Sequence, residues 1–401
     1  MKYIERAELN TLKKVMGTPD IKVITGVRRS GKSTLLAMFE EYVAASVQDA
    51  AITHVNFSKL EYEPYREYHA LNEYIEGRYD EAKRNFVFID EIQLCDNFEL
   101  AINSLHASGK YDIYLTGSNA FLLSSDLATL FAGRVFPIEV YPFSFAEYLQ
   151  YYDYDMEDEF GRYVAFDKYV AEGGFAGSYI YDDQYEKYRY ISNIYDTLVI
   201  RDIVDKYKIE NAALLMDVGE FLMDNMSRLT TANNIANVLN SARNYTNNKT
   251  VSAYLDYFCR TFAFYKVKRY DVEGKNYLRS QDKYYLCDHA LKIAKLGTKN
   301  ANYGSMYENI VAIELMRRGY EVYVGTLRDK EIDFVAKRGD EKIYVQVSYD
   351  ISEEKTFGRE VGALLAVKDA YPKLLVARTR QPEMVYEGVR VMDIADFLIG
   401  V

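Results

Sequence analysis

A short apolar run, a glycine-containing loop and a helical segment follow one another near the start of the chain. Residues 26–33 read GVRRSGKS and fit the pattern G-x-x-x-x-G-K-[ST] of a phosphate-binding loop. Residues 21–25 before the loop predict a buried strand, and residues 34–40 after it predict a helix. Glycines let such a loop wrap a polyphosphate, with successive N–H groups turned inward at a helix N-terminus. This order predicts an α/β domain that holds phosphates.

Each polar group of the loop has an expected partner. The Lys32 ammonium would reach the β- and γ-phosphates, and the Ser33 hydroxyl would be a ligand of Mg²⁺. ATP and Mg²⁺ are therefore the expected cofactors, and a glycine-rich turn that binds nothing is the alternative. The residues expected to bind the nucleotide are Gly26, Val27, Arg28, Arg29, Ser30, Gly31, Lys32, Ser33 and Thr34.

Further apolar runs recur after the loop, with helical segments between them. Strands that alternate with helices predict a mostly parallel sheet covered on both faces. We therefore expect a P-loop α/β domain over residues 1–150, opening with a helix before the first strand. The later runs are residues 52–57, 86–89, 112–116 and 135–140.

The run at residues 86–89 ends in two acids, Asp90 and Glu91. A buried strand would carry Asp90 to the carboxyl edge of the sheet, beside the phosphate loop, where it can hold Mg²⁺ through a water. Glu91 can polarise an attacking water, which favours hydrolysis of ATP over transfer to a small acceptor.

Two further polar positions are candidates for catalytic contacts. The run at residues 112–116 is followed by Ser118 and Asn119, either of which could contact the γ-phosphate or the attacking water; a strand-to-loop turn with a polar cap is the alternative. Arg134 precedes the fifth predicted strand and could reach the γ-phosphate of a neighbouring copy in a homo-oligomer. A surface ion pair is the alternative for Arg134.

Composition limits the class of protein. The chain has 401 residues, of which 49% are hydrophobic and 27% charged, a soluble balance with room for two or three domains. A net charge of −11 argues against nucleic-acid binding over the whole surface, and three scattered cysteines argue against disulfides or a zinc site. We find no signal peptide and no run of ~20 apolar residues, so we expect a cytoplasmic protein that does not engage a membrane.

The middle of the chain predicts different structures in succession. Residues 151–210 predict a helical connector. Residues 211–295 predict two helices, at 229–240 and 250–262, and then a two-stranded ribbon at 264–286. Two helices followed by a ribbon are typical of a winged-helix domain.

Positive charge gathers in residues 225–283. They hold ten basic and four acidic residues, a net charge of +6 that leaves −17 for the rest of the chain. Double-stranded DNA could be contacted here through its phosphates, and a protein-docking module or a lid is the alternative. The basic residues of the ribbon are Lys266, Lys268, Arg269, Lys275 and Arg279.

Residues 296–401 have the layout of a restriction-nuclease fold. Glu308 lies on a predicted helix, Asp333 on a strand, and Gln346 and Ser348 on the next strand, where a spacing of two turns both to one side. Nuclease chemistry would need a carboxylate at position 346 and a lysine at position 348. Because glutamine is a poor ligand for a hard dication, we expect a nuclease-like domain that docks or binds DNA without cutting it.

At this point the sequence resembles the bacterial and archaeal AAA-type ATPases that carry a C-terminal DUF4143 domain. The resemblance rests on GVRRSGKS, FVFIDE, LTGSNA, LFAGRVFPIEVYPFSF and EGGF, and on KEIDFVA and YVQVSY near the C-terminus. It implies an AAA-like first domain, a winged-helix middle and a restriction-nuclease-like C-terminal fold.

These expectations combine into an ATPase that hydrolyses ATP with Mg²⁺ and couples its nucleotide state to a partner. An ATP-gated DNA nuclease and a regulatory protein that binds ATP without turnover are the alternatives. A GTPase is disfavoured because no N-K-x-D motif is present.

Overall fold

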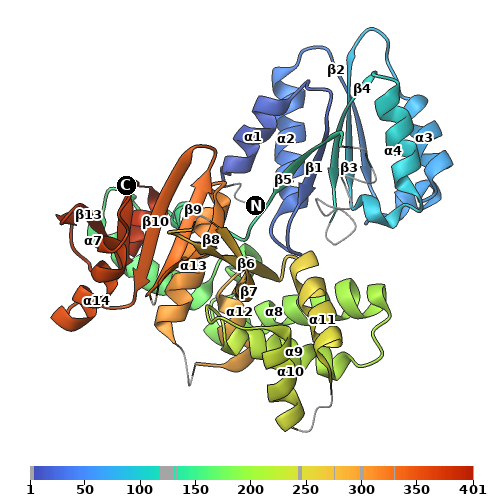
Figure 1. Ribbon diagram of the computed structural model, residues 1–401. Helices are drawn as coiled ribbons and strands as arrows, with labels where there is room; N and C mark the ends of the chain where they lie inside the picture. Colours follow the sequence, from blue (N-terminus) through green and yellow to red (C-terminus); the bar gives the residue numbers. More distant parts are fainter. Residues whose placement is uncertain are drawn as a thin grey trace. The chain divides into compact units, whose positions relative to one another are not determined.

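The computed structural model describes residues 4–117, 131, 133–242, 246–274, 276–298, 302–328 and 330–400, without the side chains of residues 276 and 278–280. The chain divides into two compact units, Met1–Tyr141 and Pro142–Val401. Each unit has its own sheet (Figure 1).

The first unit is built on a five-stranded sheet in the order β2-β3-β4-β1-β5, and every neighbouring pair is parallel. The five strands predicted from the sequence are confirmed, with ends that differ by one or two residues. The strands are β1 (Ile21–Thr25), β2 (Ala50–Asn56), β3 (Arg84–Asp90), β4 (Tyr111–Thr116) and β5 (Val135–Glu139).

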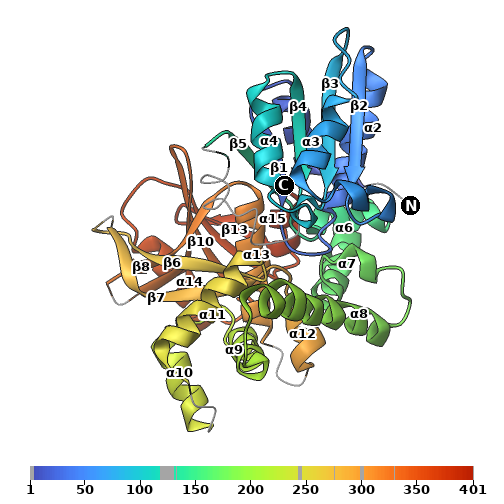
Figure 2. The same ribbon diagram turned by 90° about the vertical axis from the view of Figure 1, so that its right-hand side faces the viewer.

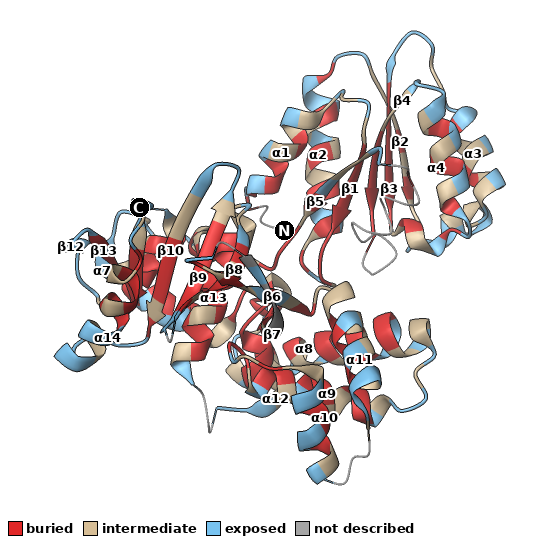
Figure 3. Ribbon diagram, in the orientation of Figure 1, coloured by how far each residue is buried: buried red, intermediate tan, exposed pale blue. Residues whose placement is uncertain are grey.

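Helices cover both faces of this sheet (Figure 1). Helices α1 (Ala7–Val15) and α2 (Lys32–Ser46) pack on one face, and α3 (Tyr68–Glu76) and α4 (Phe98–Ala107) on the other. All of β1 is buried, as is β3 after its first residue (Figure 3). Burial on both faces explains why these strands read as continuous apolar runs rather than alternating ones. The described part of the unit also contains two short 3₁₀ turns, η1 (Leu60–Tyr65) and η2 (Ile92–Leu94).

The second unit holds a mixed sheet of eight strands, in the order β12-β13-β11-β10-β9-β8-β6-β7. The strands are β6 (Phe264–Asp271), β7 (Asn276–Leu286), β8 (Glu321–Leu327), β9 (Lys330–Arg338), β10 (Glu341–Ser348), β11 (Lys373–Ala377), β12 (Met384–Tyr386) and β13 (Val389–Asp393).

Helices make up most of the remainder of the second unit, and the helical connector expected at residues 151–210 is present. Helix α6 (Phe145–Tyr151) precedes the connector, which contains α7 (Glu159–Glu172), η4 (Ala176–Ser178), α8 (Gln184–Thr197) and the π-helical η5 (Leu198–Asp205). The later helices are α9 (Ala212–Asp224), α10 (Ala232–Ser241), α11 (Asn248–Arg260), α12 (Ala290–Leu296), α13 (Tyr303–Arg317), α14 (Glu354–Leu365) and α15 (Ile394–Ile399).

The predicted ribbon is present but does not stand apart. Strand β6 pairs antiparallel with β7, as expected, and also pairs in parallel with β8 (Figure 2). The middle region and the C-terminal region therefore share one sheet across residue 295, where two separate domains were expected. The winged-helix and nuclease-like assignments stay predictions. Within the described ranges, no helix has the length and apolar character needed to span a membrane.

Candidate nucleotide-binding site

The predicted phosphate loop joins the end of β1 to the start of α2, as the strand–loop–helix order requires. Gly26 has a φ of 134° and Gly31 a φ of 99°, both in the range that favours glycine. A Cβ atom on Gly26 would lie 2.1 Å from the carbonyl oxygen of Val140, just after β5. The loop is thus held against the neighbouring strand at a position where only glycine fits.

The Lys32 side chain is folded back onto the loop. It is 5% exposed, and its Nζ donates to the carbonyl oxygens of Gly26 and Val27 at 2.9 and 2.8 Å. Both acceptors are neutral loop carbonyls, so a phosphate would offer the ammonium a stronger, charged acceptor. The Lys32 ammonium therefore lies within the loop that the sequence pattern predicts to bind the phosphates.

Arg6 supports the same loop from the chain segment before α1. Its guanidinium is buried and donates to the Ser30 carbonyl at 2.7 Å and to the Tyr141 carbonyl at 2.8 Å. Sequence reasoning did not single out Arg6, because no motif surrounds it and its partners are backbone atoms distant in sequence.

Asp90 lies at the end of β3, buried beside the start of α2. The Ser33 Oγ donates to its Oδ1 at 2.9 Å, so the two expected Mg²⁺ ligands are brought together. Asn56 Nδ2 donates to Asp90 Oδ2 at 3.0 Å, and the Thr116 hydroxyl donates to Oδ1. Three donors from three elements thus orient one carboxylate.

Asn56 and Thr116 are functional candidates that the sequence reading missed. Each is the last residue of its strand, and Asn56 is paired in register with Asp90. Because carboxyl ends of parallel strands meet at one edge, the last polar residue of every predicted strand was the available signal. Ser118 and Asn119, chosen instead, lie outside the described residues.

Glu91 follows Asp90 in a left-handed conformation with a φ of 58°. Its N–H donates to the Thr116 hydroxyl at 3.1 Å, and its carboxylate accepts a hydrogen bond from Gln93. Strained backbone of this kind concentrates at functional sites. Glu91 is the residue at which the chain leaves β3 and enters η2.

Arg134 is exposed at the opposite edge of the sheet. Its carbonyl accepts a hydrogen bond from Ile21 N at 2.9 Å, at the amino end of β1, whereas the loop leaves the carboxyl end. Five residues of strand separate the two ends, about 16 Å. No ion pair joins the Arg134 side chain to any part of the chain that the structure describes. A contact from Arg134 to the nucleotide of a neighbouring copy stays a prediction.

In the second unit, the carboxylates of Glu308 and Asp333 both lie near the ammonium group of Lys283. Lys283 Nζ lies 2.8 Å from Glu308, 2.8 Å from Glu331 and 3.9 Å from Asp333, and its side chain is 3% exposed. Burial opposes its charge, yet the three carboxylates raise the pKa of Lys283 above its usual value. Burial, with the Glu308 charge added, raises the pKa of Asp333 well above its usual range.

Gln346 and Ser348, the other two positions of the nuclease-like layout, form hydrogen bonds of their own. Gln346 Oε1 accepts from Asp333 N at 3.2 Å, and its Nε2 donates to Glu360 at 2.8 Å. The Ser348 hydroxyl donates to the Asp350 carbonyl at 3.0 Å. Nowhere in the described chain do three or more His, Cys, Asp or Glu side chains form a group that could hold a metal ion.

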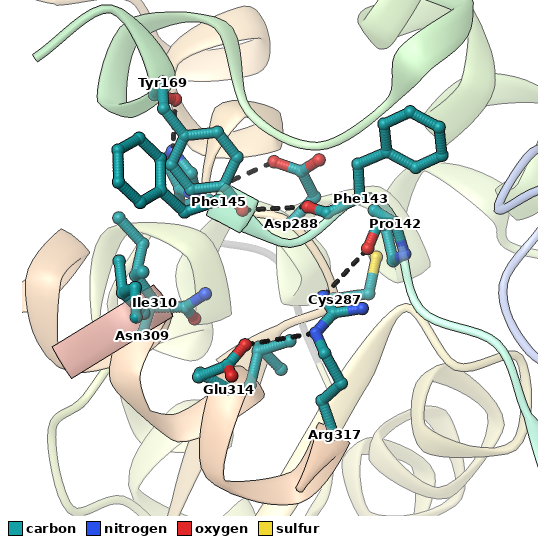
Figure 4. Close-up of a pocket in the computed structure, with 13 residues that line it drawn as sticks. Pro142, Phe143, Phe145, Tyr169, Cys287, Asp288, Asn309, Ile310, Glu314 and Arg317 are labelled. Atoms are coloured by element: carbon teal, nitrogen blue, oxygen red, sulfur yellow. Dashed lines mark hydrogen bonds and ion pairs between the residues drawn. The ribbon is translucent and has the colours of Figure 1, made fainter. Parts of the chain in front are cut away.

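A cavity of about 20 Å³ lies between α13, α7 and the segment after β7 (Figure 4). It is walled by a polar network in which Arg317 donates to the Pro142 carbonyl at 2.8 Å and Gly174 N donates to Asp288 at 2.6 Å. Phe143 N also donates to the Gly174 carbonyl at 2.7 Å. The space has room for about one water, far from the ~300 Å³ of a ligand pocket. The motifs YPFSF and EGGF meet here in a structural role.

Comparison with known proteins adds family information to this geometry. Residues 18–149 match a family described as an AAA domain, and residues 163–302 match a domain of unknown function, DUF8612. An uncharacterized protein of Haemophilus influenzae is 39% identical over 386 residues, 95% of each chain. An uncharacterized protein of Methanocaldococcus jannaschii is 26% identical over 366 residues, 87% of this chain and 79% of that one.

Solved structures overlap only loosely. Domain III of the replication initiation protein DnaA from Thermotoga maritima is 14% identical, with 50% of this chain and 89% of that one covered and a TM-score of 0.29. The Aeropyrum pernix ORC1 protein in complex with DNA is 12% identical, with 78% and 94% covered and a TM-score of 0.31.

The family comparison confirms one half of the predicted resemblance and corrects the other. The AAA part is confirmed, but the domain that follows matches DUF8612 and not DUF4143. Of the motifs that suggested DUF4143, only EGGF falls inside residues 163–302. The others lie within the AAA domain or from residue 330 onward, and so gave no information on the intervening region.

Proposed function

The chain belongs to the family of its Haemophilus influenzae relative, with an AAA domain at residues 18–149, and we propose that it binds ATP with Mg²⁺ and hydrolyses it at this loop. The observation that carries the proposal is the 2.9 Å hydrogen bond from Ser33 to Asp90 at the foot of the loop. It joins the hydroxyl of the phosphate-binding pattern to the acid at the end of β3.

Binding would begin with the backbone of the loop. Its N–H groups, at the N-terminus of α2, would surround the β-phosphate, where the helix dipole favours negative charge. Lys32 would leave the carbonyl oxygens of Gly26 and Val27 and turn to the phosphates. The exchange requires only a rotation of the side chain, because Nζ already lies over the loop.

The side chains present fit a magnesium ion. Ser33 and Asp90 offer two hard oxygen donors side by side, and Mg²⁺ keeps several waters and phosphate oxygens as its other ligands. Ser33 would hold the ion directly and Asp90 through a water. When bound, the ion would neutralise charge that develops on the phosphates.

Glu91 is the proposed group that orients and polarises the attacking water. Thr116 connects Glu91 to Asp90, since its hydroxyl accepts from the Glu91 N–H and donates to the Asp90 carboxylate. Asn56 and Thr116 are positioning residues in this proposal. Asn119 stays a candidate for a contact to the γ-phosphate.

The direct test measures ATP binding by calorimetry and phosphate release on the full chain. Lys32→Ala is expected to lose binding. Glu91→Gln is expected to bind ATP as the wild type does and to lose turnover by about 10²–10⁴-fold. Glu81→Gln, which changes an exposed glutamate of the same unit, is the control and should turn over normally. Full turnover by Glu91→Gln would exclude the role given to Glu91.

We propose that the second unit couples the nucleotide state to a partner. Double-stranded DNA stays a prediction, and ion pairs engage several of the basic residues that suggested it. Lys266 pairs with Asp282 at 2.8 Å and Arg260 with Asp256 at 2.7 Å, whereas Lys268 is exposed. The test is the ATPase rate with and without double-stranded DNA at two salt concentrations. Stimulation that fades with salt would support phosphate contacts.

An ATP-gated nuclease is not the function proposed. The Lys283 ammonium contacts Glu308 and Glu331 at 2.8 Å, where a nuclease would hold its metal ion. A cleavage assay on plasmid and linear DNA with divalent metal addresses this alternative. Cleavage that disappears in Asp333→Ala would revive it.

A further inference from the structure

Arg29 combines an unfavourable backbone conformation with a side chain that has no partner among the described residues. Its φ of 67° lies in the left-handed region, which a glycine adopts freely and other residues adopt at a cost. The side chain is exposed, and no hydrogen bond, ion pair or ring contact joins it to a residue in the described ranges. A glycine would suit this backbone better, so the arginine side chain needs its own explanation.

Three other polar side chains of the loop are placed differently. Lys32 is held by loop carbonyls and Ser33 bonds to Asp90, whereas the Ser30 hydroxyl is buried without a hydrogen-bond partner in the described chain. Two acids, Asp90 and Glu91, lie at the same edge of the sheet and would repel a polyphosphate. An exposed guanidinium in the middle of the loop would offset that repulsion.

We propose that the Arg29 side chain contacts the phosphate chain of the bound nucleotide, in addition to the contacts of the loop backbone. The inference rests on the proposed nucleotide site and names the side chain that would recognise nucleoside polyphosphates there. A guanidinium is always charged and pairs with two phosphate oxygens at once, which suits a ligand with several anionic groups. Strained residues at such positions persist where they serve a function.

The chain offers a matched control for this position. Lys208 is also an exposed cation with a positive φ, 52°, and lies in the second unit without a side-chain contact to a described residue. Lys208→Gly therefore removes the same charge and the same strain away from the loop. Arg29→Lys keeps the charge at the loop but loses the paired geometry.

The experiment measures binding of ATP, ADP and AMP by calorimetry, and thermal unfolding, for the full-length wild type, Arg29→Gly, Arg29→Lys, Lys208→Gly and Lys32→Ala. Arg29→Gly is expected to unfold no earlier than the wild type, since glycine relieves the strain. Its affinity for ATP is expected to fall about 10- to 100-fold, the range for a hydrogen bond to a charged group. For Arg29→Gly, the loss of affinity should be smaller for AMP than for ATP. The loss of affinity for ATP should be intermediate in Arg29→Lys and absent in Lys208→Gly.

The outcomes separate this inference from the function on which it rests. If Lys32→Ala abolishes ATP binding while Arg29→Gly binds ATP as the wild type does, the nucleotide site stands and the role of Arg29 is overturned. An equal loss for ATP and AMP, or a loss in Lys208→Gly, also overturns it. If the wild type does not bind ATP, both the proposed function and this inference fall.

Discussion

Gly26 is the residue at which the phosphate loop and the end of β5 come closest. Its φ of 134° is outside the range of other residues, and the Val140 carbonyl would stand 2.1 Å from any Cβ placed there. Val140 is itself held by a hydrogen bond from its N–H to the Thr25 carbonyl at 2.8 Å. A Cβ atom at position 26 would therefore clash with backbone atoms of Val140, which cannot move aside as a flexible side chain could.

Gly26→Ala is expected to destabilise the first unit by about 4–5 kcal/mol, in the range of the most damaging substitutions, and to abolish ATP binding. The measurement is the free energy of unfolding in urea. Gly109→Ala is the control, because Gly109 has a φ of 67° but nothing within 4 Å of its Cβ position. It should lose only the ~1–2 kcal/mol of the backbone conformation. Equal losses at the two positions would show that the close approach to Val140 is unimportant.

At the scale of elements, the strands of the first unit could be predicted from the sequence, but the contacts between residues at their ends could not. The five strands of the first unit were predictable because both of their faces are buried, and Asp90 was predictable because it ends such a run. Sequence alone does not give strand order, so it could mark Asn56 and Thr116 as polar strand ends at one edge of the sheet but not as contacts of Asp90. Nor could it pair β6 with β8, whose residues lie more than fifty positions apart.

Lys283 shows the same limit at the level of one side chain. It was counted among ten basic residues of a DNA-contacting region, yet it is buried among three carboxylates from α13 and β9. Lys283→Met is expected to destabilise the second unit by about 3–5 kcal/mol, because it leaves the largely buried Glu308 carboxylate without its counter-charge. Lys266→Met, which breaks the half-exposed pair with Asp282, should cost about 0–1 kcal/mol.

Urea unfolding of both lysine variants measures the difference. Two similar, small losses would mean that the Glu308 carboxylate does not depend on the charge of Lys283 in the folded protein. That result would contradict the burial and the raised pKa of Lys283 that the cluster produces.

Asp333 gives this cluster a dependence on pH. Burial raises its pKa in the folded protein well above the unfolded value, so the folded state holds a proton that the unfolded state has released. Stability from this group is therefore lost as pH rises above about 4, by up to ~1.4 kcal/mol per unit, until the raised folded pKa is passed. Asp333→Asn keeps an acceptor for Val347 N but cannot titrate.

Relative to Asp333→Asn, the wild type is expected to gain stability as pH falls from 7 toward 4, and the variant is expected to be the more stable of the two at pH 7. Unfolding free energies of both proteins across this range give the difference, in which the effects of other titrating groups cancel. A difference that does not change with pH would contradict the raised pKa of Asp333.

For the whole molecule, the two compact units divide the chemistry. The proposed nucleotide site lies entirely within Met1–Tyr141, and the buried cluster around Lys283 lies entirely within Pro142–Val401. The net charge of −11 is likewise uneven, with +6 in residues 225–283 and −17 elsewhere. Any coupling of nucleotide state to a partner of the second unit must therefore appear as an effect of ATP on that unit.

Calorimetric unfolding of the full chain tests this coupling. Two transitions are expected, of which Gly26→Ala lowers only that of the first unit and Lys283→Met only that of the second. ATP at 100 times its Kd should stabilise the first unit by about 2.7 kcal/mol, since it binds the folded state alone. If the units are coupled, ATP must also raise the second transition in the wild type, and raise neither in Lys32→Ala. An unmoved second transition would restrict the nucleotide to the first unit and contradict the coupling that we propose, while ATP binding itself would stand.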